Sequence, residues 1–175
     1  MAEPSIPDKA KLFVGILFKN NDNIEEIKNK LVKKYGSIDY TSNSIPFTHT
    51  DYYYKIGQGL SKIFFSFEKL IGREEISRIK LHTNKLEKKF SVDGERRVNI
   101  DPGYLTLSNV FLASCKDFFH RTYIGKGVFL ENEYKFSAKH YTFWEWTYPD
   151  YKKSDYLNFF HQVREIYHRQ LKLKK

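Results

Sequence analysis

The amino-acid sequence predicts a single α+β domain in which a mainly antiparallel sheet carries its helices on one face. Its 175 residues match one domain of ordinary size, which can bury a large core without disulfides. Apolar runs of strand length alternate with amphipathic segments of helix length. The first half follows the order strand, helix, strand, strand, helix, strand, which is ferredoxin-like. A hairpin and a helix then end the chain.

The first two elements have clear patterns. Residues 11–18, KLFVGILF, form a continuous apolar run, typical of a strand buried on both faces. Asn23 and Glu26 have capping-box spacing, and apolar residues then step by three or four up to Gly36. We therefore expect an amphipathic helix over residues 24–35.

The next segments complete the first half. Residues 37–47 mix β-formers with turn residues and predict a strand or an irregular edge, and residues 48–59 predict a polar, aromatic loop. Residues 60–71 predict a long strand antiparallel to its neighbour. Residues 73–90 predict a helix whose inner face carries four apolar side chains: Ile76, Ile79, Leu86 and Phe90.

The second half is rich in β-forming residues. Residues 97–100 and 109–114 predict short strands that flank a turn at Asp101–Tyr104, DPGY. Residues 120–124 and 128–136 flank Gly-Lys-Gly and predict a hairpin. The last helix is expected to start at Ser154, with an apolar face made by Tyr156, Phe159, Phe160, Val163 and Tyr167. Residues 1–10 are expected to be a flexible start and 170–175 a basic tail.

Composition narrows the classes of function. The net charge is +9, and much of the excess lies between Arg164 and Lys175, where cations also complement a helix dipole. The single cysteine cannot form an internal disulfide, and neither a membrane-length apolar run nor a signal core is present, so we expect a cytoplasmic protein without membrane contact. Aromatic residues reach 17%, which either low-GC coding bias or stacking platforms for bases would produce.

Two blocks carry a resemblance to a known family. RVNIDPGYL at residues 97–105 and WTYPDY at 146–151 resemble a bacterial family, domain of unknown function 4416. The likeness extends over nearly the whole chain, through KLFVGI, residues 50–53, GLSKIFFSFEKLI, residues 80–84 with Glu87, and residues 116–121. The family has no established activity. It usually has threonine at Cys115 and an acid near Tyr54 and Lys55, which implies that Cys115 is not a nucleophile and that no essential carboxylate follows Tyr53.

One group of candidate site residues surrounds the DPGY segment. Asn99 and Asp101 stand at i and i+2 of a strand end, so both side chains point to one face. Lys116, His120 and Arg121 follow the strand that ends at Ser114, and they offer cations and a group that titrates near neutrality. The alternatives are an Asp101 that only hydrogen-bonds its own turn, and a solvated connection held by ion pairs.

Further candidates come from other segments. Lys80 and Asn84 form a polar stripe with Glu87 on the second helix, which is otherwise read as a solvent face. Asp51 lies in the glycine-bounded loop, where it either contributes to a site or caps the loop. Cys115 is expected to be a packed strand-end residue. The cluster of Trp144, Trp146, Tyr148 and Tyr151 is expected to dock the last helix or to stack a base or sugar.

Three functions from different classes follow. The leading hypothesis is a binding domain or small enzyme for a phosphate- or carboxylate-bearing ligand such as a nucleotide. Lys116 and Arg121 would hold the anion, Asp101 or His120 would act as the general base, and Asp51, Lys80, Asn84 and Asn99 would complete the pocket. The alternatives are an RNA-binding module that uses the aromatic surface and the basic tail, with weak nucleic-acid binding, and an assembly factor. The sequence leaves the cofactor unknown. We assign no metal, because His49 and Asp51 lack a third ligand.

Overall fold

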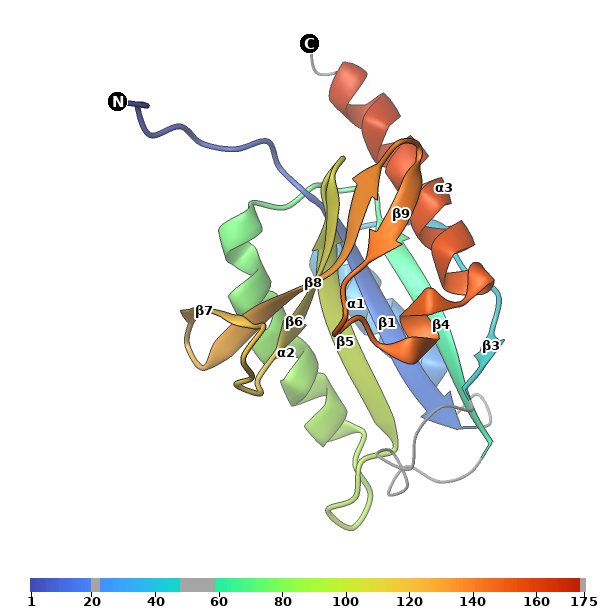
Figure 1. The fold of residues 1–175 in the computed structure, drawn as a ribbon. Coiled ribbons are helices and arrows are strands. Elements are labelled where there is room, and N and C mark those ends of the chain that lie inside the picture. Colours follow the sequence, from blue (N-terminus) through green and yellow to red (C-terminus); the bar gives the residue numbers. More distant parts are fainter. Residues whose placement is uncertain (20–22, 48–58, 174–175) are drawn as a thin grey trace.

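The computed structural model describes residues 1–19, 23–47 and 59–173 as an α+β fold with an open antiparallel sheet (Figure 1). The described part of the sheet has nine strands in the order β2-β4-β1-β5-β6-β8-β7, with β3 paired to β4 and β9 to β8. All of these pairs are antiparallel. The strands are β1 (Lys11–Lys19), β2 (Ile38–Thr41), β3 (Ile45–Pro46), β4 (Leu60–Phe67), β5 (Val98–Leu105), β6 (Asn109–Ser114), β7 (Thr122–Gly125), β8 (Val128–Ser137) and β9 (His140–Phe143).

Three helices accompany the sheet in the described part of the chain. They are α1 (Ile24–Tyr35), α2 (Ile76–Lys89), which follows the 3-10 turn η2 (Arg73–Glu75), and α3 (Ser154–Lys172), which follows η3 (Pro149–Lys152). Their apolar faces are buried as the periodicity predicts. Among the described residues, no helix combines the length and apolar character needed to cross a bilayer.

The expectation that the helices share one face of the sheet is wrong for α3. Buried residues of α1 and α2 pack with Leu12, Val14 and Ile16 of β1. The α3 side chains pack with Phe13, whose ring meets the Phe160 ring edge-on at 4.9 Å. In Figure 1, α1 lies behind the sheet and α3 in front of it. The physical reason is that β1 is apolar on both faces, so each face requires its own cover.

Most elements lie where they are expected, with local corrections. The hairpin between β7 and β8 is confirmed, with positive φ at Gly125, Lys126 and Gly127. The β4 strand ends at Phe67, four residues earlier than expected. The capping box is wrong, because Asn23 adopts a left-handed conformation (φ 59°) and its side chain makes no cap hydrogen bond.

The predicted DPGY turn is also wrong. Strand β5 runs without interruption from Val98 to Leu105, and Asp101, Pro102 and Gly103 pair with residues of β1. Gly103 serves close packing here rather than a turn. A Cβ at this position would lie 2.2 Å from the Phe111 carbonyl oxygen and 2.3 Å from the Phe13 ring. Pairing along β1 therefore overrides the turn chemistry of the local sequence.

Strands β5 and β6 pair over only part of their length. The ladder joins Gly103 to Leu112 and continues to Leu105 and Val110. Beyond Leu112, β6 continues beside β8 to the pair Ser114 and Phe129, but it no longer pairs with β5. The two strands thus part at Gly103, and helix α2, which contacts β5, β6 and β8, lies against the opening (Figure 1).

Candidate functional site

Side chains of α2 close the open edge of β5. The Ile100 amide donates to Glu87 Oε1 at 2.7 Å, and the Ile100 carbonyl accepts from Lys80 Nζ at 3.3 Å. Amides alternate in direction along a strand, so Pro102 would direct its amide to the same side as Ile100. Proline has no amide hydrogen, so β6 can leave at this point without orphaning a donor. Two helix side chains therefore replace the missing neighbouring strand.

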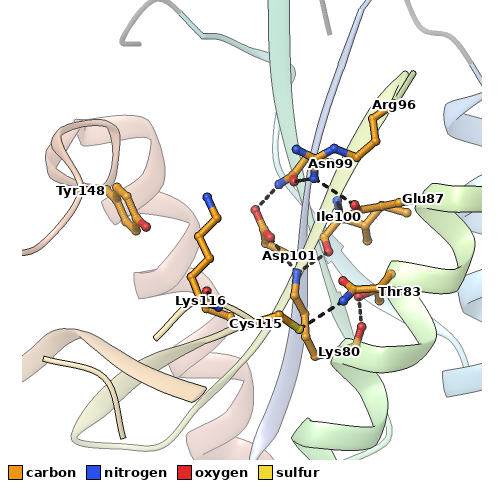
Figure 2. A network of polar contacts seen from close by, with 12 residues as sticks. Lys80, Thr83, Glu87, Arg96, Asn99, Ile100, Asp101, Cys115, Lys116 and Tyr148 are labelled. Carbon is orange, nitrogen blue, oxygen red and sulfur yellow. Dashed lines mark hydrogen bonds and ion pairs between the residues drawn. The ribbon is translucent and has the colours of Figure 1, made fainter. Parts of the chain in front are cut away.

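A polar network spreads from these contacts (Figure 2). Lys80 Nζ lies 3.0 Å from Asp101 Oδ1, and the Asn99 amide donates to the other oxygen of Asp101. Arg96 Nη1 lies 3.2 Å from Glu87 Oε2 and donates to Asn99 Oδ1 at 3.0 Å. Lys80 and Glu87 are only 6% and 5% exposed. The helix stripe is thus buried against β5, and reading it as a solvent face is wrong.

The fold shifts the pKa values of the two carboxylates of this network in opposite directions. Burial by itself raises the pKa of Asp101, but the charges of Lys80 and Lys62 and the hydrogen bonds from Lys80 and Asn99 outweigh it, so this pKa is lowered. Burial and the charge of Asp101 raise the pKa of Glu87, against the opposing effects of Lys80, Arg96 and the Ile100 amide. Asp101 is therefore the member held as an anion.

A cleft of about 670 Å³ opens over this network. Three separate stretches of chain line it: α2 through Lys80 and Asn84, β5 through Asn99 and Asp101, and the segment after β6 through Lys116. Five of the eight predicted site residues thus share one cleft. Asp51 lies outside the described residues.

The side chain of Lys116 extends into the cleft (Figure 2). Figure 2 shows its side chain extending into the space between Tyr148 and Asp101. Partial burial and the neighbouring charge of Arg121 lower the pKa of its ammonium. A flexible cation in this place is suited to meet an anionic group of a ligand.

His120 and Arg121 occupy an adjacent hollow of about 640 Å³ rather than the cleft. Both hold the carboxylate of Glu131, through His120 Nε2 at 2.7 Å and Arg121 Nε at 2.8 Å. Arg121 also donates to the Tyr148 hydroxyl at 2.7 Å and to the Lys116 carbonyl at 3.1 Å. These contacts hold the guanidinium of Arg121 in the wall between the cleft and the hollow.

Cys115 is exposed, so the expectation of a packed residue is wrong. Its thiol lies on the cleft wall and accepts a hydrogen bond from the Asn84 amide at 3.2 Å. The β6 strand ends one residue earlier, at Ser114, and Cys115 therefore follows the last paired position.

The aromatic cluster before α3 divides into two parts. Tyr151 is buried and packs on Tyr156 and Phe160 at ring-centroid distances of 5.3 and 6.1 Å, as expected for docking α3. Trp144 and Trp146 instead stack on each other at 5.3 Å, and His120 stacks on Trp146 at 5.2 Å.

Sequence analysis did not identify several charged residues in and near the cleft. Lys62 lies on β4, 3.9 Å from Asp150 and over the ring of Tyr151 at 5.1 Å. Glu131 and Glu133 are buried on β8, and burial together with Glu131 raises the pKa of Glu133 well above its ordinary range. The available signal is charge within strand patterns: a lysine inside LSKIFFSF, and two acids at alternate positions of VFLENEYKFS.

Within the described ranges, no group of three or more histidine, cysteine or acidic side chains has a geometry that could hold a metal ion. The cleft lining includes amide, carboxylate and ammonium groups.

Comparison with known proteins places the chain in a family. The model of the domain of unknown function DUF4416 matches residues 8–167, so this protein belongs to that family. A search of curated proteins gave no match, and a search of solved structures gave none either.

Proposed function

We propose that the cleft between α2, β5 and the segment after β6 binds a small phosphate- or carboxylate-bearing ligand such as a nucleotide, and that the domain acts as a binding module or a small enzyme. The observation that carries this proposal is convergence. Lys80, Asp101 and Lys116 come from three separate stretches of chain and line one cleft. Polar groups from distant segments that meet in a concave space are the usual basis of a ligand site.

The side chains of the cleft suit distinct roles. Lys116 would contact the anionic group, and the amide of Asn84 lies on the same wall. Asp101 is held ionised by Lys80 and Asn99, so it would accept a hydrogen bond from a ligand hydroxyl; as a general base it would be a weak one, because its pKa is lowered. His120 lines the adjacent hollow, which makes Asp101 the better-placed base for a ligand in the cleft.

We also propose a ferredoxin-like arrangement for the first half of the chain. The element order β1-α1-β2-β4-α2-β5 and the strand order β2-β4-β1-β5 support it. In this arrangement β5 is the outer strand of the unit, and the cleft lies where the C-terminal strands join it.

A thermal-shift experiment tests the ligand proposal. The purified protein is heated with inorganic phosphate, pyrophosphate, ribose 5-phosphate and the common nucleoside monophosphates, because a ligand that binds the folded state raises its Tm by mass action. We expect at least one of them to raise the Tm of the wild type. The Lys116→Ala variant should lose most of that shift, since it lacks the cation in the cleft.

Lys85→Ala is the matched control, because Lys85 is an exposed lysine of α2 that does not line the cleft. It should shift as the wild type does. Equal shifts in all three proteins, or no shift with any of these anions, would contradict the proposal.

The RNA-binding alternative has one observation in its favour. Phe118 and Phe119 are 57% and 77% exposed beside Arg121, and exposed aromatic side chains near cations can stack bases. The salt-dependence experiment in the Discussion separates this alternative from the small-ligand proposal.

A further inference from the structure

We infer that the hollow beside the cleft receives the planar heteroaromatic ring of the same ligand, which makes the ligand a nucleoside phosphate. This inference rests on the proposed function of the cleft and names its substrate class. The two spaces adjoin each other, since Lys116, Glu131 and Tyr148 line both. A volume of about 640 Å³ is in the range of ordinary small-molecule sites.

Aromatic side chains form half of the lining of the hollow, and charged side chains form the other half. Trp144, Trp146 and His120 form a stack of three nearly parallel rings, with interplanar angles of 5° in both steps. Phe118 and Phe119 meet the His120 ring edge-on at 5.3 and 4.8 Å. Stacking on aromatic side chains contributes about 1–3 kcal/mol per base.

The exposure of the two phenylalanines needs a physical reason. Large apolar side chains that lie together on the surface usually mark a binding surface. Phe118 and Phe119 adjoin each other at 5.1 Å between ring centroids, at the rim of a hollow rather than on a flat face. A hollow of this kind fits one ring better than a continuous nucleic-acid strand.

A buried nitrogen supplies the second, independent observation. The side chain of His120 is 6% exposed, and its Nε2 is engaged by Glu131, yet its Nδ1 has no hydrogen-bond partner among the residues that the structure describes. A buried polar atom without a partner costs about 1–3 kcal/mol. The polar edge of a heteroaromatic ring would satisfy this nitrogen, whereas a purely apolar ligand would leave it unpaired.

Charge fixes the orientation of the ligand. Lys116 lines both spaces, and Arg121 is anchored by Glu131 and Tyr148 at their boundary. A ligand whose ring packs on the exposed faces of Phe118 and Phe119 would therefore place its phosphate toward Lys116 and the cleft. Cations at this boundary favour a nucleotide over an uncharged nucleoside.

Intrinsic fluorescence gives a direct test, because the chain has only two tryptophans and both belong to the ring stack. The protein is titrated with the four common ribonucleosides, their 5′-monophosphates and ribose 5-phosphate, with excitation at the red edge of indole absorption. We expect at least one monophosphate to change the tryptophan emission and its nucleoside to do so more weakly. Ribose 5-phosphate should raise the Tm without changing the emission.

The Phe119→Leu variant should fold normally, because this side chain is largely exposed. We expect its affinity for the active monophosphate to fall about tenfold, equivalent to about 1.4 kcal/mol, through loss of stacking. Its Tm shift with ribose 5-phosphate should be unchanged. Phe143→Leu is the matched control, an exposed phenylalanine of β9 outside the hollow, and should bind as the wild type does.

The two proposals fail in different ways. If Phe119→Leu binds every monophosphate as the wild type does, or if no nucleotide changes the emission, the ring site is overturned. The cleft proposal survives that result when ribose 5-phosphate still protects the wild type but not Lys116→Ala. Tight binding of a single-stranded RNA, lost in Phe119→Leu and without binding of monophosphates, would also overturn the inference.

Discussion

The backbone amide of Ile100 donates a hydrogen bond to Oε1 of Glu87 at 2.7 Å, so a helix side chain occupies the position of a neighbouring strand. Lys80 donates to the Ile100 carbonyl, so a second helix side chain takes the place of the acceptor's strand partner. Lys80 and Glu87 are seven residues apart on α2, which places both side chains on one face of the helix. The two backbone groups that Ile100 directs toward the opening between β5 and β6 therefore both have partners on α2.

The first prediction concerns this hydrogen bond. Glu87→Ala should lower the free energy of unfolding by about 1–3 kcal/mol, because the buried Ile100 amide loses its acceptor. Glu87→Gln keeps an oxygen at that position and should be far milder. Urea denaturation of both variants measures the difference. Equal losses in the two variants would show that the amide hydrogen bond is not what stabilises the strand edge.

The same glutamate gives a pH dependence. Its pKa is raised in the folded state, so the folded protein binds this proton more tightly than the unfolded chain. The wild type should therefore lose stability relative to Glu87→Gln as the pH rises from the ordinary glutamate pKa through the raised one. Above that window, the difference should stay constant.

The second prediction concerns the pair Lys80–Asp101. Asp101→Asn leaves the buried ammonium of Lys80 without its counter-ion, which should cost about 3–5 kcal/mol of stability near neutral pH. The pKa of Asp101 is lowered in the fold, so its contribution is present above the ordinary aspartate pKa and is lost as the pH falls through the lowered one. The difference between the wild type and Asp101→Asn should accordingly shrink in acid.

The double variant Lys80→Met/Asp101→Asn is the control for this pair. Removing both charges should recover part of the loss, since no isolated buried charge remains. A double variant whose loss equals the sum of the two single losses would show that the charges act independently.

The third prediction concerns Cys115. The thiol is exposed, so a thiol reagent should modify it in the folded protein. Cys115→Ser should keep ligand binding within a few-fold of the wild type, because it retains a small group on the cleft wall that the Asn84 amide can reach. Isothermal titration with the best ligand of the thermal-shift screen measures this. Abolished binding in a folded Cys115→Ser protein would assign the thiol an essential role.

The fourth prediction separates the small ligand from nucleic acid. Helix α3 extends to Lys172, and Leu171 packs against the core, so neutralising charges is a cleaner change than truncation. In Lys172→Gln/Lys174→Gln/Lys175→Gln, weak RNA binding should decline further. The slope of log affinity against log salt should flatten by up to about 0.7 for each RNA phosphate that the tail no longer neutralises. Binding of the small ligand in the cleft should not change.

The contrary result is equally clear. RNA binding that keeps its salt slope in the tail variant and disappears in Arg121→Lys would place nucleic acid at the hollow itself. Arg121→Lys retains a positive charge but loses the planar donor fork that now contacts Glu131 and Tyr148.

Strong periodicity made much of the fold predictable. The apolar run of β1 and the faces of α1, α2 and α3 are recognisable because burial imposes them on the sequence. The side of the sheet that α3 covers is not recognisable in this way, since it depends on how distant segments assemble. The DPGY segment misleads for the same reason: its local turn preference is overridden by pairing with β1.

The grouping of the candidate site residues was predictable to a similar extent. Asn99 and Asp101 are two residues apart on one strand, and Lys80 and Asn84 are four apart on one helix, so each pair shares a face by local geometry alone. The partner of His120 and Arg121 was not predictable, because Glu131 reaches them from β8 only after the C-terminal hairpin has formed.

The side chains that contact the edge of β5 also bear on strand pairing between molecules. An unpaired strand edge is a template for strands of other molecules and a common starting point for aggregation. At Ile100 this template is masked, since the donor and the acceptor of this residue are held by α2, and at Pro102 no amide hydrogen is available. Glu87 and Lys80 therefore occupy the backbone groups of Ile100 through which a strand of a second molecule would pair with β5.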